Sequence, residues 1–142
     1  MHIRPSIIII ENERLLTLKY NYGGNEVFAL PGGNLEFGES MEDALKRELV
    51  EELGIGVEVK DLKFAAEVHQ EKKDTLHMVF SGHILKGIPT INPIETSAEA
   101  VAWLSIQDLD SIAMYPNIAK YLKNIGSESL TQFLGEIHQP WY

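Results

Sequence analysis

The stretch of sequence that decides the fold runs from Leu30 to Ile55 and reads LPGGNLEFGESMEDALKRELVEELGI. It begins with a turn that contains Pro31, Gly32 and Gly33. Proline fixes φ and has no N–H group, so Pro31 ends the strand before it. The two glycines allow backbone angles closed to other residues and let a ligand approach the main chain. The turn over residues 31–33 therefore has the properties of a loop that binds a ligand, and it is called the binding loop below.

A helix is predicted from Met41 to Leu53. Ser40 is suited to the N-cap position, because its hydroxyl can accept a hydrogen bond from an unpaired N–H group of the first turn. Gly54 is suited to the position after the last turn, where the backbone often becomes left-handed. The helix therefore follows the glycine turn closely.

The acidic residues of this helix lie beside its apolar side. With 3.6 residues per turn, Glu48, Glu51 and Glu52 share an arc of about 100°. An adjacent stripe is formed by Leu45, Leu49 and Leu53. Like charges at this spacing repel one another, so either water solvates the three glutamates or a cation binds them. Carboxylate and main-chain oxygens are the ligands that Mg²⁺ and Mn²⁺ prefer.

Composition narrows the class of protein. The chain has 142 residues, which predicts a single domain over residues 1–142. Its net charge of −9 argues against nucleic acid as a partner, because a negative surface repels phosphate backbones. It has no cysteine, which excludes disulfides and thiol chemistry. The longest isoleucine run, residues 7–10, is too short to cross a membrane, so a cytoplasmic location and no membrane partner are expected.

The rest of the chain alternates between strands and helices. Apolar, β-branched segments predict strands over Ser6–Ile10, Arg14–Tyr20, Val27–Leu30, Gly56–Val59, Leu62–Gln70, Leu76–Leu85 and Ala100–Leu104. The first two of these are expected to form a hairpin, as are Leu62–Gln70 and Leu76–Leu85. A surface loop is predicted over Gly87–Ser97. This order of elements predicts a mixed α+β layered domain.

A second helix is predicted near the C-terminus. A helical turn is expected over Ile106–Ile112 and a helix over Tyr115–Asn124, with Pro116 in its first turn. A core-facing stripe is expected from Ile118, Tyr121, Leu122 and Ile125, which recur at helical spacing. The tail from Leu130 to Tyr142 is apolar enough to pack against the domain, but its type of structure stays open.

The spacing of the charged residues resembles a known motif. Gly33 is followed after five residues by Glu39, and after seven more by the run from Arg47 to Ile55. This resembles the complete Nudix box, G-x5-E-x7-R-E-U-x-E-E-x-G-U, where U is aliphatic. All nine specified positions match within 23 residues. A hairpin before the box, the LPGG entry and a later strand that carries Trp103 are also similar to the family.

The resemblance implies a fold and an activity. Nudix proteins are α/β/α sandwiches with a mixed central sheet, the box loop and helix, and a C-terminal helix. They hydrolyse the diphosphate linkage of a nucleoside diphosphate joined to another group, using Mg²⁺ or Mn²⁺ and water. The expected activity is therefore that of a MutT-like pyrophosphatase. Two alternatives stay open: a Nudix-fold sensor that binds a nucleotide without cleaving it, and an acidic-helix protein without a metal site.

The resemblance also implies a role for each residue of the box. Glu48 and Glu52 are expected to bind the metal directly, together with the main-chain carbonyl of Gly32. Glu51 is expected to bind a second metal through water or to help deprotonate the nucleophile. The expected catalytic residues also include Arg47, which with Glu39 would orient the other carboxylates.

A further acid outside the box is common in the family, near the start of the strand that carries the tryptophan. Here the candidates are Glu95 and Glu99, neither at the commonest distance before Trp103. Glu99 is the preferred candidate, and a solvated loop acid is the competing interpretation.

The sequence leaves the substrate open. A nucleoside triphosphate, a nucleotide sugar or a similar small nucleotide is the expected partner, and a homodimer is an open alternative. ADP-ribose-cleaving members tend to have a proline where this chain has Gln70 or Glu71. The run from His138 to Trp141 resembles part of an NADH-cleaving motif, but lies too far from the box to count. Aromatic residues that could stack on a base are Tyr20, Tyr22, Phe28, Phe37, Phe80 and Tyr115.

Overall fold

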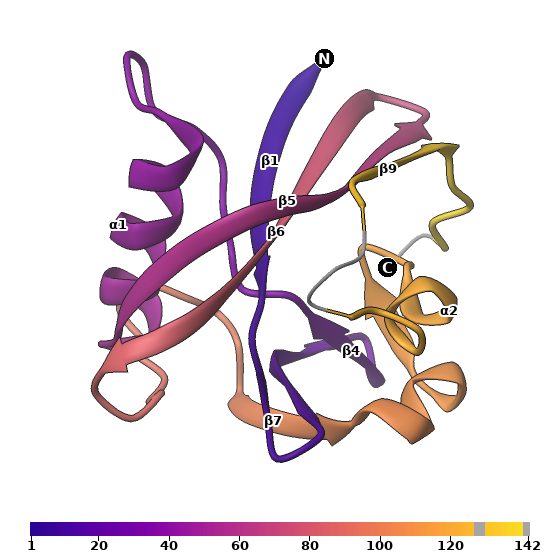
Figure 1. Cartoon of the computed structure of the whole chain (residues 1–142). Helices are drawn as coiled ribbons and strands as arrows, with labels where there is room; N and C mark the ends of the chain where they lie inside the picture. Colours follow the sequence, from indigo (N-terminus) through magenta and orange to yellow (C-terminus); the bar gives the residue numbers. More distant parts are fainter. Residues whose placement is uncertain (127–129, 141–142) are drawn as a thin grey trace.

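A computed structural model of the chain describes residues 1–126 and 130–140 (Figure 1). One sheet has the order β1-β6-β5-β9. Its strands are β1 (His2–Ile8), β5 (Gly56–Gln70), β6 (Lys73–Lys86) and β9 (Gln132–Glu136). β5 and β6 are antiparallel, whereas β1 is parallel to β6 and β9 is parallel to β5. This sheet is therefore mixed.

A second mixed sheet is built around β3. It contains β2 (Ile10–Glu11), β3 (Arg14–Tyr22), β4 (Asn25–Ala29), β7 (Ala100–Ser105) and β8 (Ala113–Tyr115). β2, β4 and β7 are each antiparallel to β3, and β8 is parallel to β4. The strands of the predicted fold are therefore divided between two sheets.

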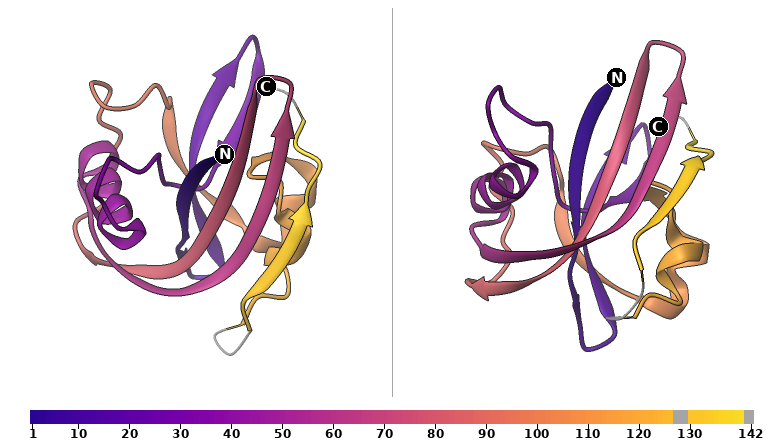
Figure 2. Two further views of the ribbon diagram at one scale, coloured as in Figure 1. Left: turned by 90° about the horizontal axis from the view of Figure 1, so that it is seen from above. Right: turned by 45° about the horizontal axis from the view of Figure 1, so that its top comes forward.

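The helices lie on opposite sides of these strands. α1 (Met41–Leu53) lies on one side, and the short 3-10 helix η1 (Ile106–Ser111) and α2 (Ala119–Leu122) lie on the other (Figures 1 and 2). The β5–β6 hairpin extends from beside α1 across the molecule (Figure 2). The arrangement confirms the predicted α+β sandwich.

Two apolar cores correspond to these two sides. Ile7 and Ile9 are fully buried in the core that α1 covers, whereas Ile8 is buried in the core that η1 and α2 cover. Likewise, Leu16 is buried in the core that α1 covers and Leu15 in the core that η1 and α2 cover. Side chains of a strand alternate between the faces of a sheet. The first three isoleucines of the run thus form a chain segment buried on both faces, as is typical of strands covered by helices, whereas Ile10 is exposed.

The predicted bounds of α1 are confirmed. Ser40 is the N-cap, and its Oγ accepts a hydrogen bond from the Asp43 N–H at 3.1 Å. Gly54 follows the last turn at φ 67°, in the left-handed region that favours glycine. The predicted apolar stripe is buried, with Leu45, Leu49 and Leu53 at most 1% exposed. α1 is therefore held in a single rotational setting about its axis.

The first predicted hairpin is only partly present. β2 forms a tight antiparallel pair with β3, but β1 pairs with β6, and Ser6 lies opposite Val79. The second predicted hairpin is confirmed as β5 and β6, whose pairing ends at Gln70 and Lys73. Two separate strands were predicted over Gly56–Val59 and Leu62–Gln70. The structure joins them into β5, one continuous strand with a register shift between Val59 and Leu62.

The second predicted helix is wrong in its extent. α2 covers only residues 119–122, and Tyr115 belongs to β8, where it lies opposite Ala29. The Leu30 N–H donates to the Tyr115 carbonyl at 3.0 Å, so pairing along β4 and Leu30 draws this segment into a strand. The core-facing stripe is nevertheless confirmed, because its four residues pack in the core on this side, with Ile118 and Leu122 fully buried.

Two further segments complete the domain. The predicted helical turn near residue 106 is present as η1, and the loop over residues 87–97 contains no strand or helix. Within the apolar tail, β9 adds to the edge of the first sheet at β5. Across the described residues, none of the helices is long and apolar enough to span a bilayer.

Candidate active site

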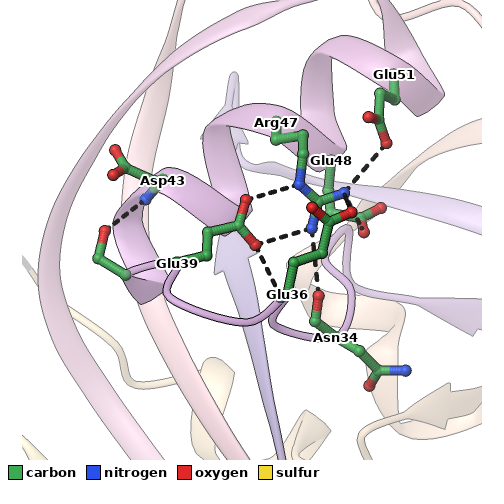
Figure 3. A network of polar contacts seen from close by, with 8 residues as sticks. Asn34, Glu36, Glu39, Asp43, Arg47, Glu48 and Glu51 are labelled. Atoms are coloured by element: carbon green, nitrogen blue, oxygen red, sulfur yellow. Dashed lines mark hydrogen bonds and ion pairs between the residues drawn. The ribbon is translucent and has the colours of Figure 1, made fainter.

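Arg47 lies at the centre of a network of carboxylates on α1 and the preceding loop (Figure 3). Its Nε and Nη2 donate to the two carboxylate oxygens of Glu39 at 2.7 and 3.0 Å. Its Nη1 donates to Glu48 at 3.1 Å and to Glu51 at 3.2 Å. Nη2 also donates to the Asn34 carbonyl at 3.3 Å. A guanidinium fork fixes direction as well as distance, so Arg47 sets the orientation of three glutamates.

Glu39 fastens the binding loop to the helix. Besides the two bonds from Arg47, one of its oxygens accepts a hydrogen bond from the Glu36 N–H at 3.0 Å. The hydrogen bond from Arg47, followed by that from Glu36, lowers the pKa of Glu39 below its ordinary value. Glu39 therefore acts as an anionic anchor for the turn between the glycines and α1.

Glu48 packs against the main chain of the binding loop. A Cβ atom at Gly33 would lie 2.4 Å from both Cδ and Oε1 of Glu48, so only glycine leaves room for the carboxylate. The Glu48 side chain is 16% exposed. Burial raises the pKa of Glu48, and the charge and hydrogen bond of Arg47 oppose that shift. The loop thus forms a cradle for this carboxylate.

Glu52 lies one helical turn beyond Glu48 and is half-buried. Burial, and then the charge of Glu48, raise the pKa of Glu52 to about 7. The charge of Arg4 and a hydrogen bond from Thr96 act in the opposite direction. Two neighbouring carboxylates that resist ionisation are stabilised in their charged form by a bound cation.

The binding loop is attached to β1 by main-chain hydrogen bonds. The Ile7 N–H donates to the Pro31 carbonyl at 3.0 Å, and the Gly33 N–H donates to the Pro5 carbonyl at 3.2 Å. Gly32 lies opposite Ser6 in this bridge. A Cβ atom at Gly32 would lie 2.3 Å from the Pro5 carbonyl oxygen, so the two backbones approach closely. This attachment places the main-chain oxygens of the loop near the start of the acid-bearing helix face.

The loop over residues 87–97 supports the end of α1. The Asn92 N–H donates to the Glu52 carbonyl at 2.9 Å, and the Asn92 side chain donates to the Glu51 carbonyl at 3.2 Å. The Thr90 N–H donates to the Leu53 carbonyl at 3.0 Å. These bonds satisfy carbonyls that have no partner within the helix. Asn92, Thr96 and Arg4 have no motif around them, and the sequence gives no signal for their role.

Glu99 is held against β3 by two contacts with Lys19. Its carboxylate is 3.9 Å from the Lys19 Nζ, and its N–H donates to the Lys19 carbonyl at 2.7 Å. Lys19 also pairs with Glu26 at 3.1 Å. The structure thus brings together Glu39, Arg47, Glu48 and Glu51 by direct contact, and places Glu99 in an ion pair with β3.

The donor set fits a hard divalent cation that keeps some of its water. Over the described ranges, no group of three acidic, histidine or cysteine side chains is close enough to hold a metal ion by itself. Glu48 and Glu52 instead supply two carboxylates, and the Gly32–Gly33 main chain lies against the first of them. Mg²⁺ binds through one or two carboxylates and retains several waters, which matches this arrangement.

Of the run from His138 to Trp141, the structure describes His138, Gln139 and Pro140. The Gln139 side chain accepts a hydrogen bond from the Asn117 N–H at 2.8 Å and donates to the Met114 carbonyl at 3.2 Å. Its role here is to hold the tail against the segment after β8. Trp141 lies outside the described residues.

Comparison with known proteins gives relatives of two activities. The chain is 29% identical over 122 residues to the NAD-capped RNA hydrolase NudC of Pseudomonas putida. This alignment covers 84% of this chain and 43% of that protein. It is 45% identical over 56 residues to an ADP-ribose pyrophosphatase of Methanocaldococcus jannaschii, which covers 39% of this chain and 33% of that protein. The chain therefore spans less than half the length of these curated relatives.

Solved structures share the fold. The crystal structure of an ADP-ribose pyrophosphatase from Streptococcus suis superposes with a TM-score of 0.70 at 21% identity, covering 93% of this chain and 98% of that one. The family model of the NUDIX domain matches residues 1–125. Because this match covers most of the chain and includes the whole acid-bearing loop and helix, the chain belongs to the Nudix hydrolase family.

Proposed function

We propose that this chain is a divalent-metal-dependent hydrolase that cleaves the diphosphate linkage of a small nucleotide derivative. Nudix hydrolases generally use divalent metal ions, and we propose Mg²⁺ or Mn²⁺ here. The observation that carries the proposal is the acid pair: Glu48 lies against the binding loop, Glu52 follows one helical turn later, and both have raised pKa values. The proposed unit of function is the single domain predicted over residues 1–142.

Each residue of the site has a part in the proposed reaction. Glu48, Glu52 and the Gly32 carbonyl would hold the cation. A bound divalent cation neutralises the diphosphate and lowers the pKa of the attacking water. Glu51, which is 39% exposed, can reach solvent and would accept the proton of the nucleophile or hold a second cation through water.

Arg47 and Glu39 would keep these carboxylates in position, since their hydrogen bonds join the loop to the helix. A role of Glu99 as an additional acid stays a prediction. The names of the relatives, an NAD-capped RNA hydrolase and an ADP-ribose pyrophosphatase, support a nucleotide-derived diphosphate as the substrate.

The test is a hydrolysis screen with Mg²⁺ and with Mn²⁺. The substrates are nucleoside triphosphates, nucleotide sugars, ADP-ribose, dinucleoside polyphosphates and coenzyme A, with the products identified. We expect Glu51→Gln and Glu52→Gln each to reduce turnover of the best substrate by about 10²–10⁴-fold. Both variants should keep the far-ultraviolet circular dichroism of the wild type.

Glu42→Gln is the matched control, because Glu42 lies in the first turn of α1, paired with Lys46. It should retain full turnover. Wild-type turnover by Glu52→Gln would contradict the proposed mechanism. Calorimetric nucleotide binding with no release of phosphate or pyrophosphate from any substrate would instead identify a sensor.

A further inference from the structure

Thr96 supplies a buried hydroxyl group to the loop that supports the end of α1. The side chains of Thr96 and Ala98 are both buried. The three residues that alternate with them are exposed: Glu95, Ser97 and Glu99. The acids of this segment therefore face solvent, and the polar side chain that faces the interior is a neutral threonine.

Three groups contact the Thr96 hydroxyl. The Ala98 N–H donates to the Thr96 Oγ1 at 3.2 Å. The same oxygen lies 3.2 Å from the Tyr20 hydroxyl oxygen, and Thr96 is also a hydrogen-bond partner of the Glu52 carboxylate. The hydroxyl thus connects β3, which carries Tyr20, to α1, which carries Glu52.

The chemistry of these groups sets the direction of each hydrogen bond. A hydroxyl has one proton and two lone pairs, whereas an ionised carboxylate can only accept. Thr96 therefore gives its proton to Glu52. Its lone pairs accept from the Ala98 N–H and from the Tyr20 hydroxyl. Because every site of the Thr96 hydroxyl is used, it cannot rotate without breaking one of these bonds.

Tyr20 is itself held in place. Its ring packs against the apolar core that α1 covers. The ring is also parallel within 4° to the Tyr22 ring, at a centroid distance of 5.8 Å. With Arg4 and Tyr115, Tyr20 lines an open pocket of about 250 Å³. A hydroxyl on a ring fixed in this way gives the Thr96 hydroxyl a fixed direction.

The main chain of the loop contacts the same glutamate. The Thr96 N–H donates to the Asn92 carbonyl at 3.1 Å, and the Asn92 N–H donates to the Glu52 carbonyl at 2.9 Å. Glu52 is therefore held at both ends, its main chain by Asn92 and its carboxylate by Thr96.

We propose that Thr96 is a positioning residue for Glu52: its hydroxyl, directed by Tyr20, holds the carboxylate in the orientation in which it binds the cation. The inference rests on the proposed function, in which Glu52 is a ligand of that cation. Glu48 is oriented by the charged Arg47 of the same helix, whereas the partner of Glu52 is neutral and comes from a distant loop. A neutral donor orients a carboxylate without neutralising it, so the negative charge stays available to the metal.

The test measures Mg²⁺ binding to the full chain by titration calorimetry in the absence of substrate, with Mn²⁺ measured in parallel. Thr96→Val keeps the branched shape but lacks the hydroxyl, and should weaken Mg²⁺ binding about tenfold. Thr96→Ser keeps the hydroxyl and should bind Mg²⁺ like the wild type. Thermal unfolding of each variant establishes that it is folded before binding is compared.

Thr17→Val is the matched control. Thr17 is also buried, and its Oγ1 donates to the Ala102 carbonyl at 2.7 Å. Loss of this hydroxyl should lower the free energy of unfolding but leave the Mg²⁺ affinity unchanged.

Tyr20→Phe tests the direction of the hydrogen bonds. It removes only the hydroxyl that directs Thr96, so it should weaken Mg²⁺ binding less than Thr96→Val does. The double variant Tyr20→Phe/Thr96→Val should bind Mg²⁺ as Thr96→Val does, because Tyr20 acts through Thr96. Additive losses in the double variant would overturn the part assigned to Tyr20.

The outcomes distinguish this inference from the proposed function. Wild-type Mg²⁺ affinity in Thr96→Val, or equally weak binding by Thr96→Ser, would overturn the inference, as would an equal loss in Thr17→Val. A wild type that binds neither Mg²⁺ nor Mn²⁺ would overturn the proposed function and this inference together. A wild type whose Mg²⁺ binding depends on the Thr96 hydroxyl but which hydrolyses no nucleotide would overturn only the hydrolase proposal.

Discussion

Gly32 and Gly33 are neighbours, yet a methyl group would meet different partners at each. At Gly32 the nearest atom would be the Pro5 carbonyl oxygen of β1, which is backbone and cannot move aside without separating the loop from the strand. At Gly33 it would meet the end of the Glu48 side chain, which can rotate. The first glycine therefore serves the fold, and the second keeps a carboxylate in its place.

Alanine substitutions should separate these two effects. Gly32→Ala should lower the free energy of unfolding by about 1–3 kcal/mol, as overpacking against a fixed neighbour does. Gly33→Ala should leave that free energy within about 1 kcal/mol of the wild type but reduce turnover by about 10–100-fold, because Glu48 is displaced. Urea unfolding and kcat measured on the same preparations provide the comparison. Full turnover by Gly33→Ala would show that Glu48 is not needed in its present position.

At the scale of elements, α1 depends on a loop that is distant in sequence. The apolar stripe sets its rotation about its axis, and Ser40 and Gly54 set its ends. The last carbonyls of the helix are satisfied from residues 87–97, mainly by Asn92. The final turn, which carries Glu51 and Glu52, is therefore stabilised by hydrogen bonds from this loop.

Asn92→Ala should loosen that turn. The side-chain bond to the Glu51 carbonyl is lost, which should cost about 1 kcal/mol in the free energy of unfolding. Amide hydrogen exchange should accelerate selectively at the C-terminal end of α1 and not in its first turn. Asn25→Ala, at an exposed position of β4, is the control. An unchanged exchange pattern would mean that the loop does not stabilise the helix end.

At the scale of the whole molecule, the acid pair lowers the stability of the domain that carries it. Glu52 has a folded-state pKa of about 7, above the ordinary value of 4.5. The folded protein therefore binds more protons than the unfolded chain between these two values. The resulting stabilisation is fully present below about pH 4.5 and is lost as the pH rises through 7. At pH 8, without a cation, the charged pair opposes folding.

This gives a prediction for metal and pH together. Metal-free Glu52→Gln should have a higher Tm than the metal-free wild type at pH 8, and the difference should shrink toward pH 5. Adding Mg²⁺ at pH 8 should raise the Tm of the wild type, because the cation binds only the folded state, and should raise that of the variant less. Calorimetric scans at both pH values test it. A variant less stable than the wild type at pH 8 would contradict the account of Glu52.

Local signals were sufficient for one part of this molecule. Caps, helical periodicity and the spacing from Gly33 to Ile55 predict α1 to the residue and place Arg47 beside the glutamates, because each signal acts over only a few residues. The same reasoning was wrong for Tyr115, whose helical pattern was overridden when Leu30 and Ala29 paired with it as a strand.

The rest was decided by tertiary structure. Arg4, Tyr20 and Tyr115 are distant along the chain, and strand pairing brings them to one pocket, next to which Thr96 is hydrogen-bonded to Tyr20. Because that pairing depends on long-range burial, no local pattern marks these residues. The acids of the site are therefore encoded in one continuous stretch, whereas the surroundings of these acids exist only in the folded chain.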